Sequence, residues 1–217
     1  MTYPLRRDGK IIRRSQPLEI SAGLIKELRD KTAVGIMDCK EALTESEGDI
    51  QKAIEYLRKK GIATAKKRGG RTTSQGQVQS YIHGGGKIGV LVEVNCETDF
   101  TGKTEDFTSF VRDLAMQIAA TNPVAIDRER VPEEIIQKEK EIYASQARET
   151  GKPEKVIEKI VEGKLKKFYS EACLLEQPFV KNPDITVQDL ANEMMAKTGE
   201  NIVIKRFVRF QLGEEDA

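Results

Sequence analysis

The chain has 217 residues, and its 36 basic and 35 acidic side chains leave a net charge of only +1. This length suits a moderate domain with its own hydrophobic core plus a smaller one. The balanced charge provides no overall positive field, so we expect no direct nucleic-acid binding. No apolar run approaches the roughly 18 residues of a membrane span, and the N-terminus lacks a signal-peptide apolar segment, so we expect no membrane association and a cytoplasmic location.

Residues 1–17 contain five basic side chains and little apolar content, which predicts a flexible basic extension. The next segment, residues 18–61, is predicted to form three short helices, with Ser21 and Asp49 placed to cap the first and the third. We expect the third helix to end at Gly61. Apolar side chains recur at helical spacing, so this segment should be a compact three-helix domain similar to ubiquitin-associated domains.

A linker rich in Lys, Arg and Gly is predicted at residues 62–75 and an acidic tail at residues 214–217. Between them, residues 76–213 are predicted to form the larger core domain. Residues 78–82 and 88–94 alternate apolar and polar side chains around a His-Gly-Gly-Gly turn. This pattern predicts a β-hairpin.

Helices and one further strand follow the hairpin. Apolar spacing predicts a helix over residues 104–120, with Thr104 placed as its cap. Residues 132–169 contain two amphipathic stretches around a Gly-Lys-Pro sequence, which predicts an antiparallel helical hairpin. Thr186 has the spacing of a capping box for a helix that ends at Gly199, before a last strand at residues 202–212. The fold class is therefore predicted to be α+β, with a three-stranded antiparallel sheet and helices on one side.

The strand predicted at residues 88–94 leads into Asn95-Cys96-Glu97-Thr98-Asp99-Phe100, where an acidic residue directly precedes a large apolar ring. Such a pair, on the short connection between a strand and a helix, is well placed to insert into a partner. The alternative is structural: Thr98 or Asp99 caps a turn, and Phe100 fills the local core. Taken alone, these residues favour the structural alternative.

The three cysteines Cys39, Cys96 and Cys173 are far apart and lack CxxC spacing, which is typical of reduced thiols rather than a zinc site. An enzyme with Cys96 as nucleophile is one alternative function. The neighbouring Glu97 would raise the pKa of this thiol, and no evident base accompanies it, so we assign no catalytic residue.

His83 is the only histidine, and its simplest interpretation is a polar turn residue. No second imidazole is available for a metal cluster, so no metal site and no cofactor are predicted. The His-Gly-Gly-Gly turn lacks the lysine-hydroxyl ending of a phosphate-binding loop, so the protein itself should bind no nucleotide.

Several segments closely resemble the elongation factor Ts family, in the family's order and with similar spacing. Asn95 to Phe100 resembles the family signature, and the other matches are residues 24–29, 35–43 and 48–58, Gly151-Lys152-Pro153, Val161-Glu162-Gly163, Gln177-Pro178-Phe179-Val180 and Gly199-Glu200-Asn201-Ile202. The resemblance covers roughly residues 18–213 and is to the short bacterial form of the factor.

This resemblance implies a translation elongation factor that acts by binding, without covalent chemistry. Its partner would be elongation factor Tu, the GTPase that delivers aminoacyl-tRNA to the ribosome. Thr98, Asp99, Phe100 and Thr101 would bind this partner, with Asp99 and Phe100 entering between two helices of the GTPase domain. Their entry would displace groups that hold Mg²⁺, promote GDP release and keep the GTPase nucleotide-free until GTP binds.

One departure from the family lies directly after this signature. The family usually continues with Val-Ala-Arg or Val-Ala-Lys, whereas this chain has Thr101-Gly102-Lys103. Thr101 offers less apolar contact and Gly102 loosens the backbone, so we expect an intact insertion element on a less rigid connection.

By the same resemblance, Lys26, Arg29, Ile36 and Met37 occupy positions that face the GTPase domain in a first docking contact, and His83 is a candidate for a minor contact. The ordinary interpretation of these residues is structural. Ile36 and Met37 would then be core residues, and Lys26 and Arg29 would be solvated.

Longer family members carry two related subdomains in the core, and this chain has the segments of one. We expect Tyr81, Leu91 and Phe207 on the sheet face that the helices leave uncovered, which would be a sizeable exposed apolar patch. Together these points imply a homodimer whose sheet faces pack against each other. A ribosome or nascent-chain binding module is the alternative; it would explain the helical bundle and the basic segments but not the later family matches.

Overall fold

The computed structural model describes residues 20–32 and 34–214. The chain divides between Lys60 and Gly61 into two compact units. The basic extension predicted at residues 1–17 and residues 215–217 of the predicted acidic tail lie outside the described residues.

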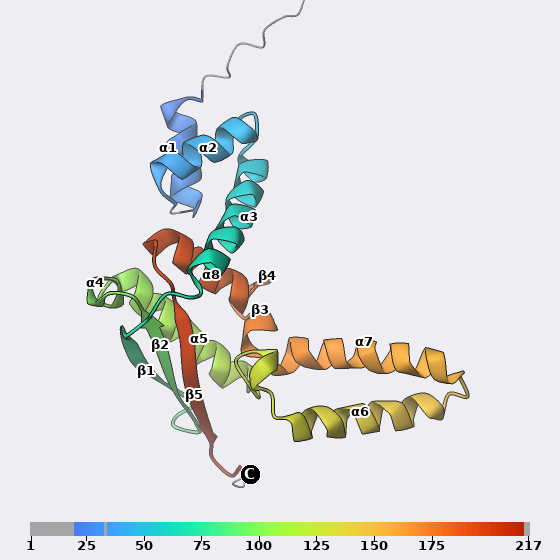
Figure 1. Cartoon of the computed structure of the whole chain (residues 1–217). Helices are drawn as coiled ribbons and strands as arrows, with labels where there is room; N and C mark the ends of the chain where they lie inside the picture. Colours follow the sequence, from blue (N-terminus) through green and yellow to red (C-terminus); the bar gives the residue numbers. More distant parts are fainter. Residues whose placement is uncertain (1–19, 33, 215–217) are drawn as a thin grey trace, which may run out of the picture. The chain divides into compact units, whose positions relative to one another are not determined.

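The N-terminal unit is a three-helix bundle of α1 (Ala22–Thr32), α2 (Ile36–Glu45) and the first part of α3 (Ile50–Arg68) (Figure 1). The predicted caps are confirmed: the backbone N–H of Leu24 donates to Ser21 Oγ at 3.2 Å, and that of Lys52 donates to Asp49 Oδ1 at 3.0 Å. Fully buried side chains from all three helices form its core, namely Leu28, Cys39, Ala42, Leu43 and Ala53.

The prediction that the third helix ends at Gly61 is wrong, because α3 continues to Arg68. A glycine inside a helix costs only about 1 kcal/mol relative to alanine, which tertiary contacts readily offset. One such contact holds the end of α3, where Arg68 Nη1 donates to the carbonyl oxygen of Met195 at 2.8 Å. The start of the predicted linker is therefore helical.

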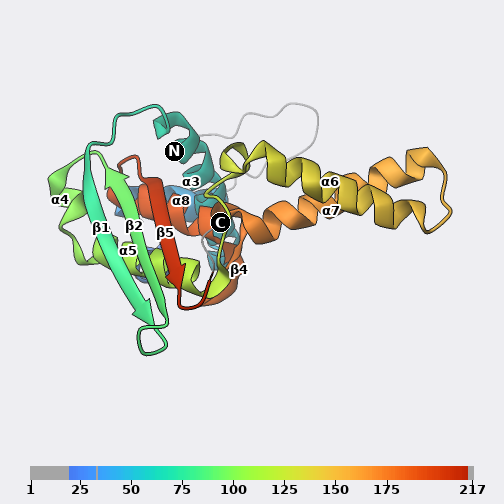
Figure 2. The ribbon, with the colours of Figure 1, turned by 90° about the horizontal axis from the view of Figure 1, so that it is seen from below.

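The second unit contains the predicted sheet. Strands β1 (Gln75–His83), β2 (Ile88–Cys96) and β5 (Val203–Gln211) pair antiparallel in the order β1-β2-β5 (Figure 2). The glycines of the β1–β2 turn all have positive φ angles, between 62° and 92°. The predicted hairpin and the α+β class are confirmed.

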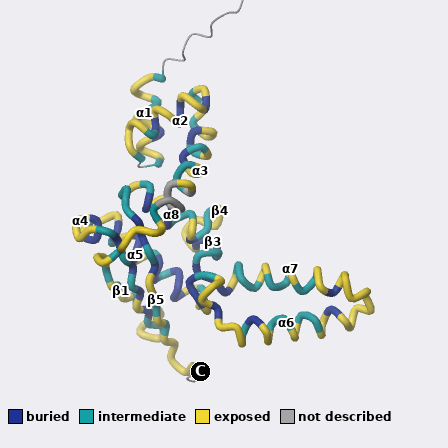
Figure 3. The backbone as a smooth tube through the Cα atoms, in the orientation of Figure 1, coloured by how far each residue is buried: buried dark blue, intermediate teal, exposed yellow. Residues whose placement is uncertain are grey.

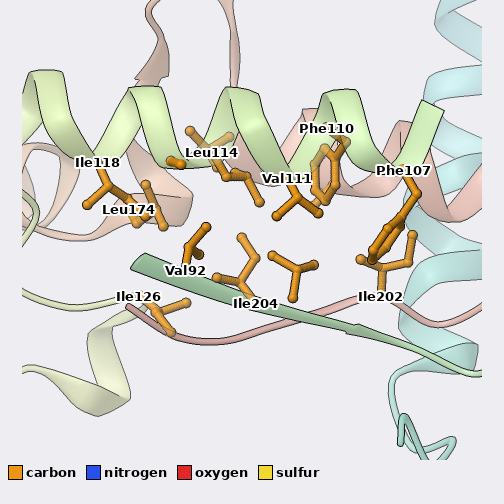
Figure 4. Close-up of a cluster of buried hydrophobic side chains, with 14 of the residues drawn as sticks. Val92, Phe107, Phe110, Val111, Leu114, Ile118, Ile126, Leu174, Ile202 and Ile204 are labelled. Atoms are coloured by element: carbon orange, nitrogen blue, oxygen red, sulfur yellow. The ribbon is translucent and has the colours of Figure 1, made fainter. Parts of the chain in front are cut away.

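Two helices, α5 (Glu105–Thr121) and α8 (Val187–Thr198), supply the side chains that bury one face of this sheet. Figure 4 shows the α5 side chains pointing toward Val92 and Ile204 of the sheet. The predicted caps of both helices are confirmed. Thr104 accepts a hydrogen bond from the backbone N–H of Phe107, and Thr186 forms a capping box with Asp189.

The other face of the sheet is apolar and exposed. We call it the open sheet face, and it carries Val78, Ile82, Leu91, Val208 and Phe210, which are 40–67% exposed. The prediction for Leu91 is therefore correct, but that for Tyr81 and Phe207 is wrong. Both pack against the core, because Tyr81 pairs with Val90 and Phe207 pairs with Val92 in the sheet.

This error has a physical origin in the register. Adjacent residues of a strand point to opposite faces, so the face of each side chain depends on which residues pair. Four residues connect His83 to its partner Ile88, and this loop length sets the pairing along the whole hairpin. Alternation within one strand does not reveal it.

The predicted helical hairpin is confirmed as α6 (Glu133–Arg148) and α7 (Glu154–Ala172), and Figures 1 and 2 both show it projecting away from the sheet. Five short elements were not predicted: α4 (Asp99–Gly102), η1 (Arg128–Arg130), η2 (Leu174–Glu176), β3 (Pro178–Phe179) and β4 (Asn182–Thr186). None of the helices within residues 20–32 and 34–214 has the length and apolar character needed to cross a membrane.

Candidate functional site

The segment between β2 and α5 is a single helical turn, α4. Thr98 is its N-cap residue, and Thr98 Oγ1 accepts a hydrogen bond from the backbone N–H of Thr101 at 3.3 Å. At the other end, Thr104 Oγ1 donates to the carbonyl oxygen of Thr101 at 2.8 Å. The acid–aromatic pair therefore lies on an ordered turn rather than on an irregular loop.

Phe100 is 78% exposed, among the highest values for a large apolar side chain in the described residues. The alternative that Phe100 fills the local core is wrong, although Thr98 does cap a turn as that interpretation required. Figure 3 shows α4 as a turn with both exposed and buried residues. Exposing a large aromatic ring forgoes its hydrophobic stabilisation, so this placement is informative about function.

Asp99 is also exposed and forms an ion pair with Lys103, whose Nζ lies 2.7 Å from Asp99 Oδ2. The hydrogen bond from Lys103 lowers the pKa of Asp99 below its ordinary value. The carboxylate is therefore ionised at neutral pH and can accept hydrogen bonds from a partner.

The inner side of α4 is firmly attached to the core. Thr101 and Gly102 are buried, and Gln77 Nε2 donates both to the carbonyl oxygen of Gly102 at 2.6 Å and to Thr108 Oγ1 at 2.9 Å. A Cβ atom at Gly102 would lie 3.5 Å from Cys96 Sγ, which is ordinary van der Waals contact. The hydrogen bond from Gln77 restrains the backbone at Gly102, which opposes the flexibility expected from a glycine at this position.

A residue that sequence reasoning did not assign to the site lies behind this turn. Glu200, between α8 and β5, accepts hydrogen bonds from the backbone N–H groups of Glu97 at 3.0 Å and Thr98 at 3.1 Å, and from the Thr98 hydroxyl at 2.5 Å. Partial burial raises the pKa of Glu200, but hydrogen bonds from Thr98, Thr101 and the backbone outweigh this effect, so the pKa lies below its ordinary value. The only sequence signal was that Glu200 belongs to a segment resembling the family.

Cys96 has a structural role. It is fully buried, and Cys96 Sγ donates to the carbonyl oxygen of Thr98 at 3.1 Å. Burial raises the pKa of this thiol, which opposes a role as nucleophile. Among the described residues, no group of three or more His, Cys, Asp or Glu side chains is arranged to hold a metal ion.

The predicted docking residues lie in the N-terminal unit, and all four are exposed. Ile36 and Met37 form the start of α2 and are 53% and 76% exposed, so the interpretation that they are core residues is wrong. Lys26 and Arg29 lie on α1.

An ionic network holds α2 against α3 just after these residues. Lys60 Nζ lies 2.9 Å from Asp38 Oδ1 and 2.7 Å from Glu41 Oε2, and Tyr56 donates to Glu41 at 2.8 Å. Hydrogen bonds from Lys60 and Tyr56 lower the pKa of Glu41. The network therefore restrains the first turn of α2, where the two exposed apolar side chains lie.

His83 is not brought together with the acid–aromatic pair. It ends β1, whereas Gln75, at the other end of β1, pairs with Cys96 beside α4. The eight residue steps of extended strand between these ends span about 26 Å. The His83 ring stacks on Tyr81, and its Nδ1 lies 3.0 Å from the Tyr81 hydroxyl oxygen.

Comparison with known proteins gives one consistent match. Residues 23–214 match the family model described as "Elongation factor TS". "Elongation factor Ts" of Moorella thermoacetica is 63% identical over 195 residues, which cover 90% of this chain and 96% of the relative. The proteins of the same name from Desulfosudis oleivorans and Desulfotalea psychrophila are 62% and 60% identical to this chain. The matched regions cover 98% and 100% of these relatives' lengths. The match includes every site residue described above.

Proposed function

The chain belongs to the elongation factor Ts family and is thus a translation elongation factor, and we propose that it is the guanine-nucleotide exchange factor of elongation factor Tu. In this proposal it binds the GDP form of the GTPase in the cytoplasm, promotes GDP release and holds the nucleotide-free form until GTP binds. No bond of the nucleotide is made or broken, so the factor acts by binding alone.

The observation that carries this proposal is the exposed Phe100 ring on an ordered turn. Phe100 is the apolar anchor that enters between two helices of the GTPase domain, and Asp99 accepts hydrogen bonds there. Thr98 and Thr101 hold the turn that presents them. Their insertion displaces groups around the Mg²⁺ ion, whose charge otherwise bridges and neutralises the phosphates of the nucleotide.

Thermodynamic linkage sets the size of the effect. A factor that binds the nucleotide-free GTPase more tightly than the GDP form must weaken GDP binding by the same ratio. A 10⁴-fold shift requires about 5.5 kcal/mol of differential affinity. Burial of one Phe side chain supplies roughly 1.5–3 kcal/mol, so Phe100 acts together with further contacts.

The N-terminal unit supplies the first of these contacts. Ile36 and Met37 present apolar surface at the first turn of α2, and Lys26 and Arg29 add positive charge from α1. Such exposed apolar side chains among charged ones are typical of a binding surface. His83 makes a further, minor contact with elongation factor Tu.

The open sheet face supports a homodimer. A hollow of about 310 Å³ on this face is lined by Val78, Leu91 and Val208, with the Glu93–Arg206 ion pair beside them. Exposed apolar patches of this kind mark interaction sites. We infer that a second copy of the chain covers this face. When the same face of two protomers packs around a twofold axis, both faces are covered and no further copy can add.

A fluorescent-GDP release assay tests the exchange function. Elongation factor Tu loaded with labelled GDP is mixed with a tenth of its amount of this protein and excess unlabelled GDP. Release of all bound label at an accelerated rate is expected, because an exchange factor is recycled. A release rate equal to that of elongation factor Tu alone would overturn the proposal.

A further inference from the structure

The connection between β2 and α4 is bonded to a segment about a hundred positions later in the chain. Strands β2 and β5 pair antiparallel, and Asn95 opposite Val203 is the last pair of their ladder. Beyond this pair, side-chain carboxylates replace backbone carbonyls as acceptors. Glu200 accepts from the backbone N–H groups of Glu97 and Thr98.

The bonding is reciprocal across the two segments. Glu97 Oε1 accepts from the backbone N–H of Asn201 at 2.6 Å and from Arg71 Nη1 at 3.4 Å. Asn201 is 2% exposed, and its Nδ2 donates to the carbonyl oxygen of Arg71 at 2.9 Å. Two carboxylates and one amide thus join three segments of the second unit.

The chain is directed into this position by the end of α8. Gly199 has a φ angle of +77°, a left-handed conformation that glycine adopts without strain. The backbone N–H of Glu200 is then within 3.3 Å of Thr198 Oγ1. Glu200 therefore leaves the helix in a defined direction, toward Thr98.

The bond to the Thr98 hydroxyl connects Glu200 to the exposed pair. A hydroxyl donates one hydrogen and accepts through its lone pairs. Because Thr98 Oγ1 donates to Glu200 at 2.5 Å, its lone pairs are free to accept from the backbone N–H of Thr101. That second bond is the N-cap of α4, so Glu200 determines the orientation of the capping hydroxyl.

We propose that Glu200 is a positioning residue for exchange, which holds Thr98 and thereby fixes α4 with Asp99 and Phe100 in the geometry that enters the GTPase. This inference rests on the proposed function. The ionised carboxylate is required, because its two oxygens accept from both the backbone N–H groups of Glu97 and Thr98 and the Thr98 hydroxyl. The amide of a glutamine in its place would keep one oxygen acceptor. Its NH₂ group, which is a donor, would face the backbone N–H groups or the Thr98 hydroxyl and could not accept their hydrogen bonds.

The test compares Glu200→Gln with a matched variant, Glu176→Gln. Glu176 also accepts two hydrogen bonds, from Arg128 Nε and Nη2, but it lies on η2 and its partner lies on η1, so these bonds do not involve α4 or its cap. Backbone amide hydrogen exchange is measured by NMR on the free protein. We expect amide exchange at Glu97, Thr98 and Thr101 to become about tenfold faster in Glu200→Gln, as expected for losing about 1.4 kcal/mol of local protection.

GDP release from elongation factor Tu is measured with the same proteins. The maximal release rate is expected to fall about tenfold in Glu200→Gln and to stay unchanged in Glu176→Gln. Adding Glu200→Gln to Phe100→Ala should give little further loss, because both changes act through the same ring. Glu200→Asp, which keeps the charge on a shorter side chain, should restore part of the rate and serves if Glu200→Gln does not fold.

The two measurements separate this inference from the proposed function. Unchanged amide exchange at Glu97 and Thr98 in Glu200→Gln would overturn the positioning role whatever the release rate. A loss that adds fully to that of Phe100→Ala would overturn it as well, since Glu200 would then act elsewhere. If the wild-type protein did not accelerate GDP release from elongation factor Tu, the proposed exchange function would be wrong. The role of Glu200 in exchange would then be wrong as well. The amide exchange data would still show whether Glu200 holds α4.

Discussion

Replacing Phe100 by alanine should remove a defined share of the exchange activity. The ring is 78% exposed in the free protein, so nearly all of its apolar surface is available for burial in the partner. Losing about 2 kcal/mol of that burial corresponds to about a thirtyfold lower rate of GDP release. Because a full shift requires about 5.5 kcal/mol, a measurable residual activity should remain.

Stability should hardly change in this variant, since substitutions of exposed side chains are usually within about 0.5 kcal/mol. Tyr143→Ala is the matched control: it also removes an aromatic ring, but from α6, where Lys164 Nζ lies 5.2 Å from the ring centre. The assay is release of fluorescent GDP from elongation factor Tu, with thermal unfolding measured in parallel. Equal losses of activity in Phe100→Ala and Tyr143→Ala would refute the insertion mechanism.

Three further predictions concern docking, assembly and backbone geometry. Deleting the residues before Gly61 should weaken the complex with elongation factor Tu, because the docking side chains are lost while the second unit keeps its own core. Calorimetric titration measures the dissociation constant of this complex, and an unchanged value would contradict the docking role. Phe210→Asp places a charge in the apolar contact of the open sheet face, so this variant should be a folded monomer where the wild type is a dimer. Sedimentation velocity measures the size of both proteins. A wild-type particle of only 24.3 kDa at micromolar concentration would contradict the dimer. Gly76→Ala should destabilise the protein by about 3 kcal/mol in chemical denaturation, since a Cβ there would lie 2.1 Å from the carbonyl oxygen of Val94, at a φ angle of +140°. Gly102→Ala, whose Cβ would meet only ordinary contacts, is its control, and equal stability of the two variants would be inconsistent with this steric reasoning.

Local chemistry made much of this fold predictable. A cap connects residues three positions apart, so Thr104 and the Thr186–Asp189 box were recognisable from spacing alone, and the structure confirms both. The same holds for the β1–β2 turn, where consecutive glycines supply positive φ angles. The roles of the candidate site residues in partner binding came from the family resemblance, and they remain predictions.

Contacts between distant residues decided the rest. An aromatic ring after a strand has the same sequence pattern whether it is buried or exposed, and only the packing beneath α4 leaves Phe100 outside. In the same way, Glu200 reaches Thr98 only because β5 pairs with β2.

By itself, the sequence determined the longer helices, the three strands of the main sheet and the α+β class, because hydrophobic periodicity and capping act over a few residues. Only the tertiary structure decided that Tyr81 and Phe207 face the core and that α3 continues past Gly61. The physical reason is that strand register and long-range hydrogen bonds, such as that from Arg68 to Met195, depend on which distant segments meet, and this information is not contained in any local pattern.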